Sequence, residues 1–308
     1  MDQVKVPQVW LVIPAYFATY ILWGTTYFAV LVGLQTLPPF IMAAVRFLMA
    51  AIVLLLIVSA KGEKLFVRGA LKNMLLGVVI LTGGQGLLFW SEQYIASGTA
   101  AVLVSALPLW YVLLDVGNRK TYFSNKIIIT GLILGFLGIL LLFKKYIGVS
   151  TGNTRWQIYG FIAVIGGCIC WAAGTLYYKN SGRQGSLFLN LGWQLIGGFI
   201  SSLLVAALSM EFANFSFQHV SINSWLATAY LAVAGTLLAF VAFNWLLTVR
   251  PAAVVGTYAY VNPVIAVILG WLFANETINA LQVTGMVVIL FSAFLVNSPK
   301  YVSNKNKV

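Results

Sequence analysis

Charged residues are scarce in this sequence. Asp, Glu, Lys and Arg make up 8% of its 308 residues, whereas 61% of the residues are hydrophobic. A soluble domain has about 25% charged residues, so the chain holds too few charges to build a surface in contact with water. This scarcity excludes a soluble protein and predicts that hydrocarbon surrounds much of the folded chain.

Acidic residues are the rarest charges, six against 18 basic residues, and the net charge is +12. In a soluble protein such an excess would indicate nucleic acid as a partner. Here the basic residues lie in short segments between apolar runs, as they do in loops beside a membrane. We therefore expect membrane lipid as a partner, and no nucleic acid.

Residues that catalyse reactions or bind metals are also few. His219 is the one histidine, and the two cysteines, Cys168 and Cys170, lie in one apolar run with no second pair to complete a metal site. We interpret both cysteines as buried hydrophobic residues. The nucleotide-binding pattern Gly-x-x-x-x-Gly-Lys-Ser/Thr is missing, so ATP is not expected to drive the protein directly. These absences predict no metal, no cofactor and no enzyme activity.

Long apolar runs are what the chain has in abundance. A hydrocarbon core about 30 Å thick needs about 20 helical residues to cross it. The runs do not alternate polar and apolar residues as barrel strands do. We expect an all-α polytopic membrane protein with ten transmembrane helices, at roughly 9–32, 38–59, 71–93, 97–116, 127–146, 157–178, 187–209, 223–247, 251–274 and 279–297.

The basic residues predict how these ten spans are oriented. With the N-terminus on one side, that side holds 14 Lys and Arg residues, the other side holds three, and Arg46 lies inside a span, which accounts for all 18. Positive charge concentrates in cytoplasmic loops. We therefore expect a multi-pass protein of the cytoplasmic membrane with both its N- and C-termini in the cytoplasm.

The two halves of the chain match at nearly constant spacing, which indicates an internal duplication. The first copy covers 1–148 and the second 155–300, followed by a cytoplasmic tail at 301–308. Each copy holds five spans, and because five is odd, the second copy enters the membrane inverted. The matched pairs are Trp23 with Trp171 and Arg46 with Gln194 at an offset of 148, Trp90 with Trp245 and Pro108 with Pro263 at 155, and Thr130–Gly131 with Thr284–Gly285 at 154.

Several short motifs resemble, in order and across essentially the whole chain, the EamA-type branch of the drug/metabolite transporter superfamily. They are Trp23-Gly24-Thr25-Thr26-Tyr27, Leu37-Pro38-Pro39-Phe40 leading to Arg46-Phe47, Trp90-Ser91-Glu92-Gln93-Tyr94 through Ser97-Gly98 to Ala106-Leu107-Pro108-Leu109, and Arg250-Pro251-Ala252-Ala253 through Asn262-Pro263 to Glu276 and Thr284-Gly285.

The resemblance implies ten helices in two repeats and a secondary transporter. Such a protein moves a small metabolite or drug-like molecule across the cytoplasmic membrane by alternating access, with export the expected direction. One departure concerns acids. The family usually has a glutamate after the fourth span, matching Glu276 after the ninth, but Thr121 stands there in this chain. This puts a symmetric role for two acids in doubt.

Arg46 is the deepest cation of the sequence. It lies eight residues beyond Pro38, about 12 Å into the second span. A cation at a helix centre costs about 2.5–3.5 kcal/mol on insertion scales, so we expect it to face the bundle interior. It could contact a polar group of a substrate, or it could anchor helices through carbonyls or a carboxylate such as Glu92. Because the resemblance includes an arginine here across unlike substrates, we favour the anchor.

Glu92 ends the third span and shares a helical face with Gln85 and Phe89. A carboxyl partly inside the membrane can carry a proton, so Glu92 is a candidate for proton coupling. The alternative is a solvated residue at a helix end.

Aromatic and amide side chains inside the spans complete the candidates. Aromatic residues at helix ends are more often interfacial anchors than ligands, and buried amides either line a wet cavity or bond between helices. The candidates for lining a substrate cavity, together with Arg46 and Gln85, are Trp23, Tyr27, Trp90, Trp171, Gln194, Asn244, Trp245, Tyr258 and Asn262.

Two other classes of protein remain as alternatives to a transporter. A polytopic membrane enzyme would need a cluster of His, Asp, Cys or Ser at membrane depth, which the sequence does not contain. A channel would need no coupling and could not concentrate its substrate.

Overall fold

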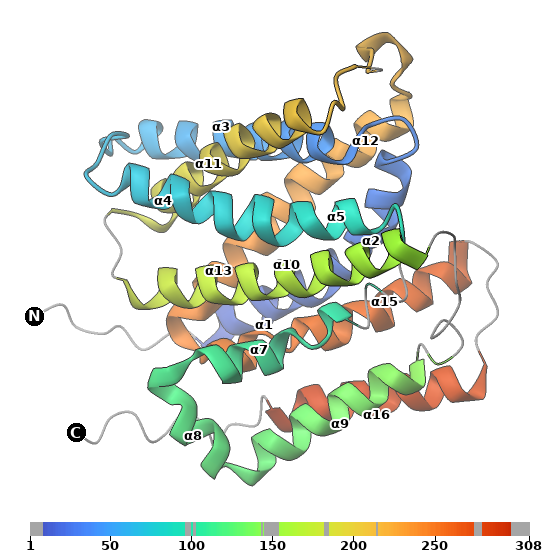
Figure 1. Ribbon diagram of the computed structural model, residues 1–308. Coiled ribbons are helices and arrows are strands. Elements are labelled where there is room, and N and C mark those ends of the chain that lie inside the picture. Colours follow the sequence, from blue (N-terminus) through green and yellow to red (C-terminus); the bar gives the residue numbers. More distant parts are fainter. Residues whose placement is uncertain are drawn as a thin grey trace, which may run out of the picture.

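The computed structural model describes residues 9–95, 100, 103–142, 144, 154–181, 185–213, 215–273 and 279–296. Within these residues the chain forms helices joined by short connections, with no strand, so the predicted all-α class is confirmed (Figure 1). The predicted tail at 301–308 and Glu276 lie outside the described residues.

The first half contains five groups of helices in chain order. They are α1 (Val9–Phe17), η1 (Ala18–Leu22) and α2 (Trp23–Gly33); α3 (Pro39–Ala60); α4 (Ala70–Gly77), η2 (Val78–Gly86) and α5 (Leu87–Ser91); α7 (Leu107–Leu114), η3 (Val116–Asn118) and α8 (Arg119–Ser124); and α9 (Lys126–Leu142).

The second half follows the same order of long elements. They are α10 (Thr154–Asn180); α11 (Leu187–Leu208) with the short η5 (Phe217–His219) after it; α12 (Ile222–Tyr230), η6 (Leu231–Phe240) and α13 (Val241–Val249); α14 (Ala252–Val255) and α15 (Tyr258–Phe273); and α16 (Ala280–Val296).

Seven helices of the described chain are long and apolar enough to cross a membrane. The count is eight if 116–124 and 126–141, which meet at an angle of 93°, form one bent span. The tenth expected span is the shorter apolar helix α16. Of the fourth expected span, the structure describes α7 and a few residues before it, and residues 97–99 and 101–102 lie outside the described residues. The prediction of ten spans therefore stays a prediction.

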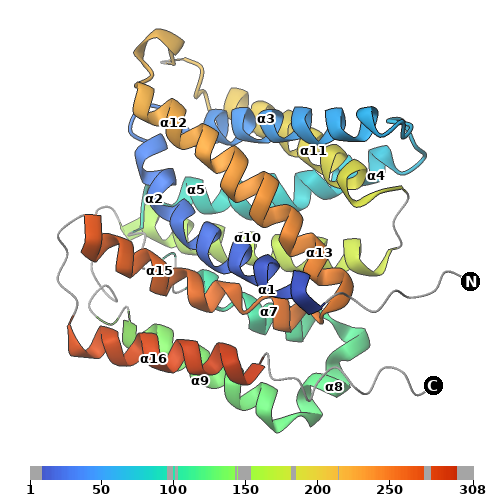
Figure 2. The same ribbon diagram turned by 180° about the vertical axis from the view of Figure 1, so that it is seen from behind.

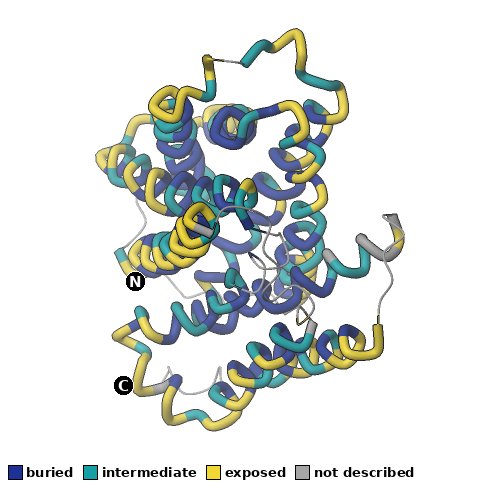
Figure 3. The backbone as a smooth tube through the Cα atoms, turned by 45° about the vertical axis from the view of Figure 1, so that its right-hand side comes forward, coloured by how far each residue is buried: buried dark blue, intermediate teal, exposed yellow. Residues whose placement is uncertain are grey.

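Large hydrophobic side chains cover the outside of the bundle, where a soluble protein would place polar ones. Ile13 is 72% exposed, Leu56 63% and Phe294 68%. Figure 3 shows the exposed residues on the outward sides of the helices and the buried ones on the sides that meet. Because soluble monomers rarely expose apolar patches of such extent, these side chains are suited to contact with lipid.

Polar residues at the helix starts satisfy the backbone groups that each first turn leaves free. The Ser186 hydroxyl accepts from the Leu189 amide at the start of α11, and the Ser221 hydroxyl accepts from the Ser224 amide at the start of α12. The start of α3 is capped from far along the chain. The Glu211 carboxylate accepts from the amides of Phe40, at 3.1 and 3.2 Å, and Ile41, at 3.0 Å.

Matching helices of the two halves pack against each other. The pair α3 and α11 lies along one flank of the bundle, and the pair α9 and α16 along the opposite flank (Figures 1 and 2). The Ser292 hydroxyl of α16 donates to the Gly131 carbonyl of α9 at 2.7 Å. Between the two flanks, the rod from α1 to α2 contacts η6 and α15, and α10 contacts η2 and α7.

The described chain has three π-helical segments: η1 in the first long element, and η2 and η6 in the third and the eighth, which match between the halves. A π-helical turn widens the backbone spiral and is frequent at functional sites. The hydrophobic pattern of the sequence did not predict these segments.

Candidate functional site

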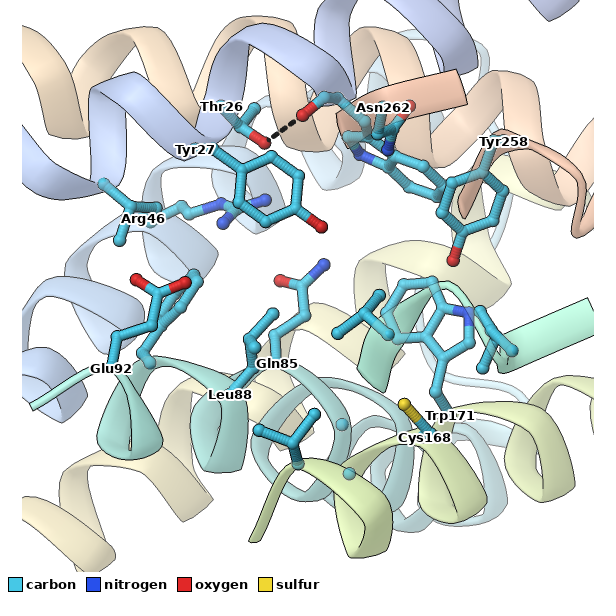
Figure 4. Close-up of a pocket in the computed structure, with 18 residues that line it drawn as sticks. Thr26, Tyr27, Arg46, Gln85, Leu88, Glu92, Cys168, Trp171, Tyr258 and Asn262 are labelled. Atoms are coloured by element: carbon cyan, nitrogen blue, oxygen red, sulfur yellow. Dashed lines mark hydrogen bonds between the residues drawn. The ribbon is translucent and has the colours of Figure 1, made fainter. Parts of the chain in front are cut away.

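Inside the bundle lies a cavity with helices of both halves around it. It holds about 740 Å³ of space not filled by atoms, its open side included. Its walls come from α2, α3, η2, α5 and α7 of the first half and from α10 and α15 of the second. Figure 4 shows the side chains that point into it.

Eight of the twelve candidate residues line this cavity. They are Trp23, Tyr27, Arg46, Gln85, Glu92, Trp171, Tyr258 and Asn262. Thr26, Leu88 and Cys168 also line it, and the sequence analysis did not single them out for this role. Cys168 lies three residues before Trp171 on α10, so a shared helical face was the available signal.

Aromatic rings close one side of the cavity. The Trp23 ring lies 4.5 Å from that of Tyr258 and 5.2 Å from that of Phe243. Trp171 lies 5.7 Å from Phe243 and meets Trp23 edge-on at 5.8 Å. Aromatic pairs that meet edge-on or tilted at these distances stabilise each other beyond the area they bury. The rings of Trp23, Trp171 and Tyr258, which line the cavity, therefore form a floor that is packed against Phe243.

Trp23 is fixed from behind by η6. Its indole Nε1 donates a hydrogen bond of 2.8 Å to the Gly235 carbonyl. Both the donor and the ring are buried, so this bond sets the orientation of the indole in the floor.

Arg46 reaches the cavity from α3 and is held by the same segment. Its Nε donates to the Thr236 hydroxyl at 2.8 Å, and the Thr236 hydroxyl donates onward to the Leu231 carbonyl at 3.2 Å. A β-carbon on Gly235 would lie 3.1 Å from Arg46 Nη2, so the glycine leaves room for the guanidinium. Arg46 is therefore anchored to η6 through a hydroxyl, and it lines the cavity together with Tyr27 (Figure 4).

Gln85 of η2 and Glu92 at the end of α5 form the facing wall. Among the described residues, no carboxylate pairs with Arg46, so the Arg46–Glu92 ion pair considered above does not form in this structure. The Gln85 Oε1 atom is buried without a hydrogen-bond partner, and the amide points into the cavity. A buried acceptor without a partner is an expected feature of a site that binds a ligand or water.

Four other candidates lie outside this cavity. Gln194 sits where α11 crosses α4, so close that a β-carbon on Gly77 would collide with its carbonyl. The Asn244 amide donates to the Phe240 carbonyl within its own helical rod at 2.8 Å. Trp90 packs on Tyr94 at 4.8 Å, and Trp245 is half-buried against the core.

The described part of the chain contains no group of three or more His, Cys, Asp or Glu side chains arranged to hold a metal ion. The cavity instead combines one cation, one acid, the two amides of Gln85 and Asn262, and a floor of aromatic rings. This set of groups can recognise a small molecule by hydrogen bonding, charge and ring contacts.

Comparison with known proteins identifies relatives along the whole chain. The model of the EamA-like transporter family matches it twice, over residues 10–144 and 158–298. The uncharacterized inner membrane transporter YedA of Escherichia coli is 34% identical over 297 residues, which cover 93% of this chain and 90% of that protein. Protein PecM of Dickeya dadantii is 27% identical and covers 93% of this chain and 92% of its own length.

Two further matches are a protein named as an efflux pump and a protein of known crystal structure. The probable amino-acid metabolite efflux pump of Salmonella typhimurium is 24% identical over 89% of this chain and 91% of that protein. A crystal structure of a protein superposes with a TM-score of 0.75, covers 94% of this chain and 96% of that one, and shares 17% identity. The likeness to this crystal structure establishes the fold alone.

Proposed function

This chain belongs to the EamA-like transporter family of drug/metabolite transporters, and we propose that it exports a small organic molecule by alternating access. In this proposal ten transmembrane helices form two inverted five-helix repeats, 1–148 and 155–300. The two repeats rock about one central site, which opens to one side of the membrane at a time.

The observation that carries the proposal is where the cavity lies. Its walls come from both halves, and Trp23 and Trp171, which occupy matched positions of the two repeats, meet at 5.8 Å on its floor. Residues that contact their own counterparts lie close to the axis relating the two halves. A site on this axis changes its access when the halves tilt, and it keeps its lining.

The lining supports an amphiphilic metabolite as the substrate. Arg46 offers a cation for a carboxylate or other polar group, Glu92 offers an acceptor for an ammonium or a proton, and the aromatic floor suits an apolar portion. The name of the Salmonella typhimurium relative, a probable amino-acid metabolite efflux pump, supports both this class of substrate and export.

Glu92 is the candidate for coupling to protons. It lines the cavity at the end of α5 and has no ion-pair partner among the described residues. A carboxyl in this position can bind a proton when the cavity faces one side and release it when the cavity faces the other. We expect Glu92→Gln to lose proton-driven transport while substrate exchange continues.

Counterflow in proteoliposomes tests the proposal. A deletion strain screened against metabolites and drugs supplies the compound, and vesicles with purified protein are loaded with it. A carrier accumulates labelled compound against its gradient during counterflow, whereas a channel only equilibrates it. Equilibration without overshoot would overturn alternating access, and chemical conversion of the compound would favour the membrane enzyme.

A further inference from the structure

A second cavity lies on the surface of the bundle and shares no lining residue with the first. It is bounded by α1 and η1, by the stretch from Arg250 into α15, and by the end of α16, and it holds about 830 Å³, its open side included. These elements meet at the end of the bundle where α1 begins and α16 finishes (Figure 2). The ten-span arrangement predicted from the sequence assigns 14 of the 18 Lys and Arg residues to this end.

The walls of this surface cavity are apolar. Val254 and Val261 form its buried side, and Leu290 and Phe294 of α16 its outer side. Leu290 is 50% and Phe294 68% exposed, and both lie on the outside of a membrane helix. The cavity is therefore open to the layer that lipid chains occupy.

One end of the surface cavity is polar and positively charged. Arg250 follows the last residue of α13, where a span ends, and is half-buried. The Lys179 ammonium donates to the Arg250 carbonyl at 2.6 Å, which fixes its backbone. In the described part of the chain, no carboxylate pairs with the Arg250 guanidinium.

Two tyrosines converge on this end. The Tyr20 hydroxyl bonds to the Thr257 hydroxyl at 2.6 Å and is satisfied. The Tyr16 hydroxyl is buried and has no hydrogen-bond partner, although it lies within electrostatic reach of Arg250. A buried hydroxyl without a partner costs free energy, and this group and the guanidinium together provide hydrogen-bond donors suited to an anion.

We propose that this surface cavity binds one anionic phospholipid. The lipid phosphate lies against the Arg250 guanidinium and the Tyr16 hydroxyl, and the acyl chains lie along Leu290 and Phe294. Arginine forms short, charge-assisted hydrogen bonds to phosphate oxygens, and basic pockets between membrane helices suit anionic headgroups. A zwitterionic lipid carries its own ammonium group and gains less from the arginine.

Lipid titration of delipidated protein in detergent tests this proposal. Phosphatidylglycerol and phosphatidylcholine with identical acyl chains are added separately, and binding is read from native mass spectra and from thermal unfolding. We expect one tightly bound phosphatidylglycerol molecule and weaker binding of phosphatidylcholine. Arg250→Gln should weaken the binding of phosphatidylglycerol about fivefold, and Tyr16→Phe should weaken it less. Arg119→Gln removes an exposed cation at the same end and should leave the binding unchanged.

Three results would overturn the proposal. Equal binding of the two lipids would remove the anionic headgroup as the recognised feature. Unchanged phosphatidylglycerol binding by both Arg250→Gln and Tyr16→Phe would place the lipid elsewhere. If inorganic phosphate protected the protein against thermal unfolding as strongly as phosphatidylglycerol does, the cavity would be a site for a free anion. Should Arg250→Gln fail to fold, Tyr16→Phe decides the question, since it removes only one oxygen. None of these results depends on whether the protein transports a substrate.

Discussion

Trp23 and Trp171 show what a single residue pair can reveal about a duplicated chain. Their offset of 148 predicted that they occupy matched positions, and the structure brings the two rings together. Trp90 and Trp245 also match, at 155, but pack outside the cavity. An offset fixes the depth of a residue along its helix and says nothing about which face of the helix carries it, so the sequence could not separate the two pairs.

Trp23 and Trp171 on the cavity floor should therefore matter more for transport than Trp90 and Trp245 outside the cavity. Trp171→Ala removes ring contacts of about 1.5 kcal/mol, and we expect the initial rate of counterflow to fall about tenfold. Trp245→Ala, a loss of the same side chain outside the cavity, should keep the rate within about a factor of two. Equal losses in both variants, after normalisation to protein in the vesicles, would contradict a special role for the floor.

Thr236 could not be predicted from the sequence, because its partner Arg46 lies 190 residues away and only the fold brings them together. Thr236→Val keeps the shape of the side chain but leaves the buried Nε of Arg46 without its hydrogen-bond acceptor. We expect a loss of about 1–3 kcal/mol in the free energy of unfolding, measured in detergent. Thr248→Val removes an exposed hydroxyl that bonds only within its own helix, and it should cost little. Similar losses would mean that Arg46 is satisfied by other groups.

At the scale of elements, the π-helical segments η2 and η6 organise the site. Both Trp23 and Arg46 bond to η6, and Gln85 belongs to η2. Apolar periodicity identifies a buried helix, but it does not reveal a widened π-helical segment inside that helix. The sequence therefore predicted the long helices to within a few residues and missed the local geometry that aims the side chains.

The contact of Glu211 with the start of α3 is a second element that sequence reasoning missed, because it joins residues about 170 apart. Burial raises the pKa of the Glu211 carboxyl, and the amides of Ile41 and Phe40 lower it by less, so the net shift is upward. The folded protein then binds this proton more tightly than the unfolded chain. This contribution to stability is present at acid pH and is lost as the pH rises through the raised pKa.

A pH series of thermal unfolding in detergent measures this effect. The stability of the wild type relative to Glu211→Gln should decrease as the pH rises from about 4 toward neutrality. An increase of that difference with pH would show that the two amide hydrogen bonds outweigh burial and that the carboxylate form is favoured in the folded protein.

At the scale of the whole molecule, composition alone predicted the fold class, since 8% charged residues cannot cover a soluble protein. The number of spans is harder to predict because α7, α9 and α16 are short for a membrane crossing. Packing of α9 on α16 buries one face of each, so tertiary contacts support helices that length alone would not identify.

The distribution of 14 basic residues against three predicts the orientation of the molecule in the membrane. Reporter fusions after Val308 and in the loop at Gly62 should both report the cytoplasm, and a fusion at Ala213 the outside. Opposite signals from the first two fusions would mean an odd number of crossings between them and would contradict the ten-span arrangement.

Access to the cavity from both sides of the membrane is the central claim, and sided cysteine labelling tests it most directly. Leu88, which lines the cavity, is changed to Cys in a chain with Cys168→Ala and Cys170→Ala, and an impermeant thiol reagent is applied to either face of the membrane. We predict that Leu88→Cys reacts from both faces and that substrate slows both reactions, whereas Leu56→Cys on the outside of the bundle reacts from neither. Reaction from one face only, with or without substrate, would contradict the account.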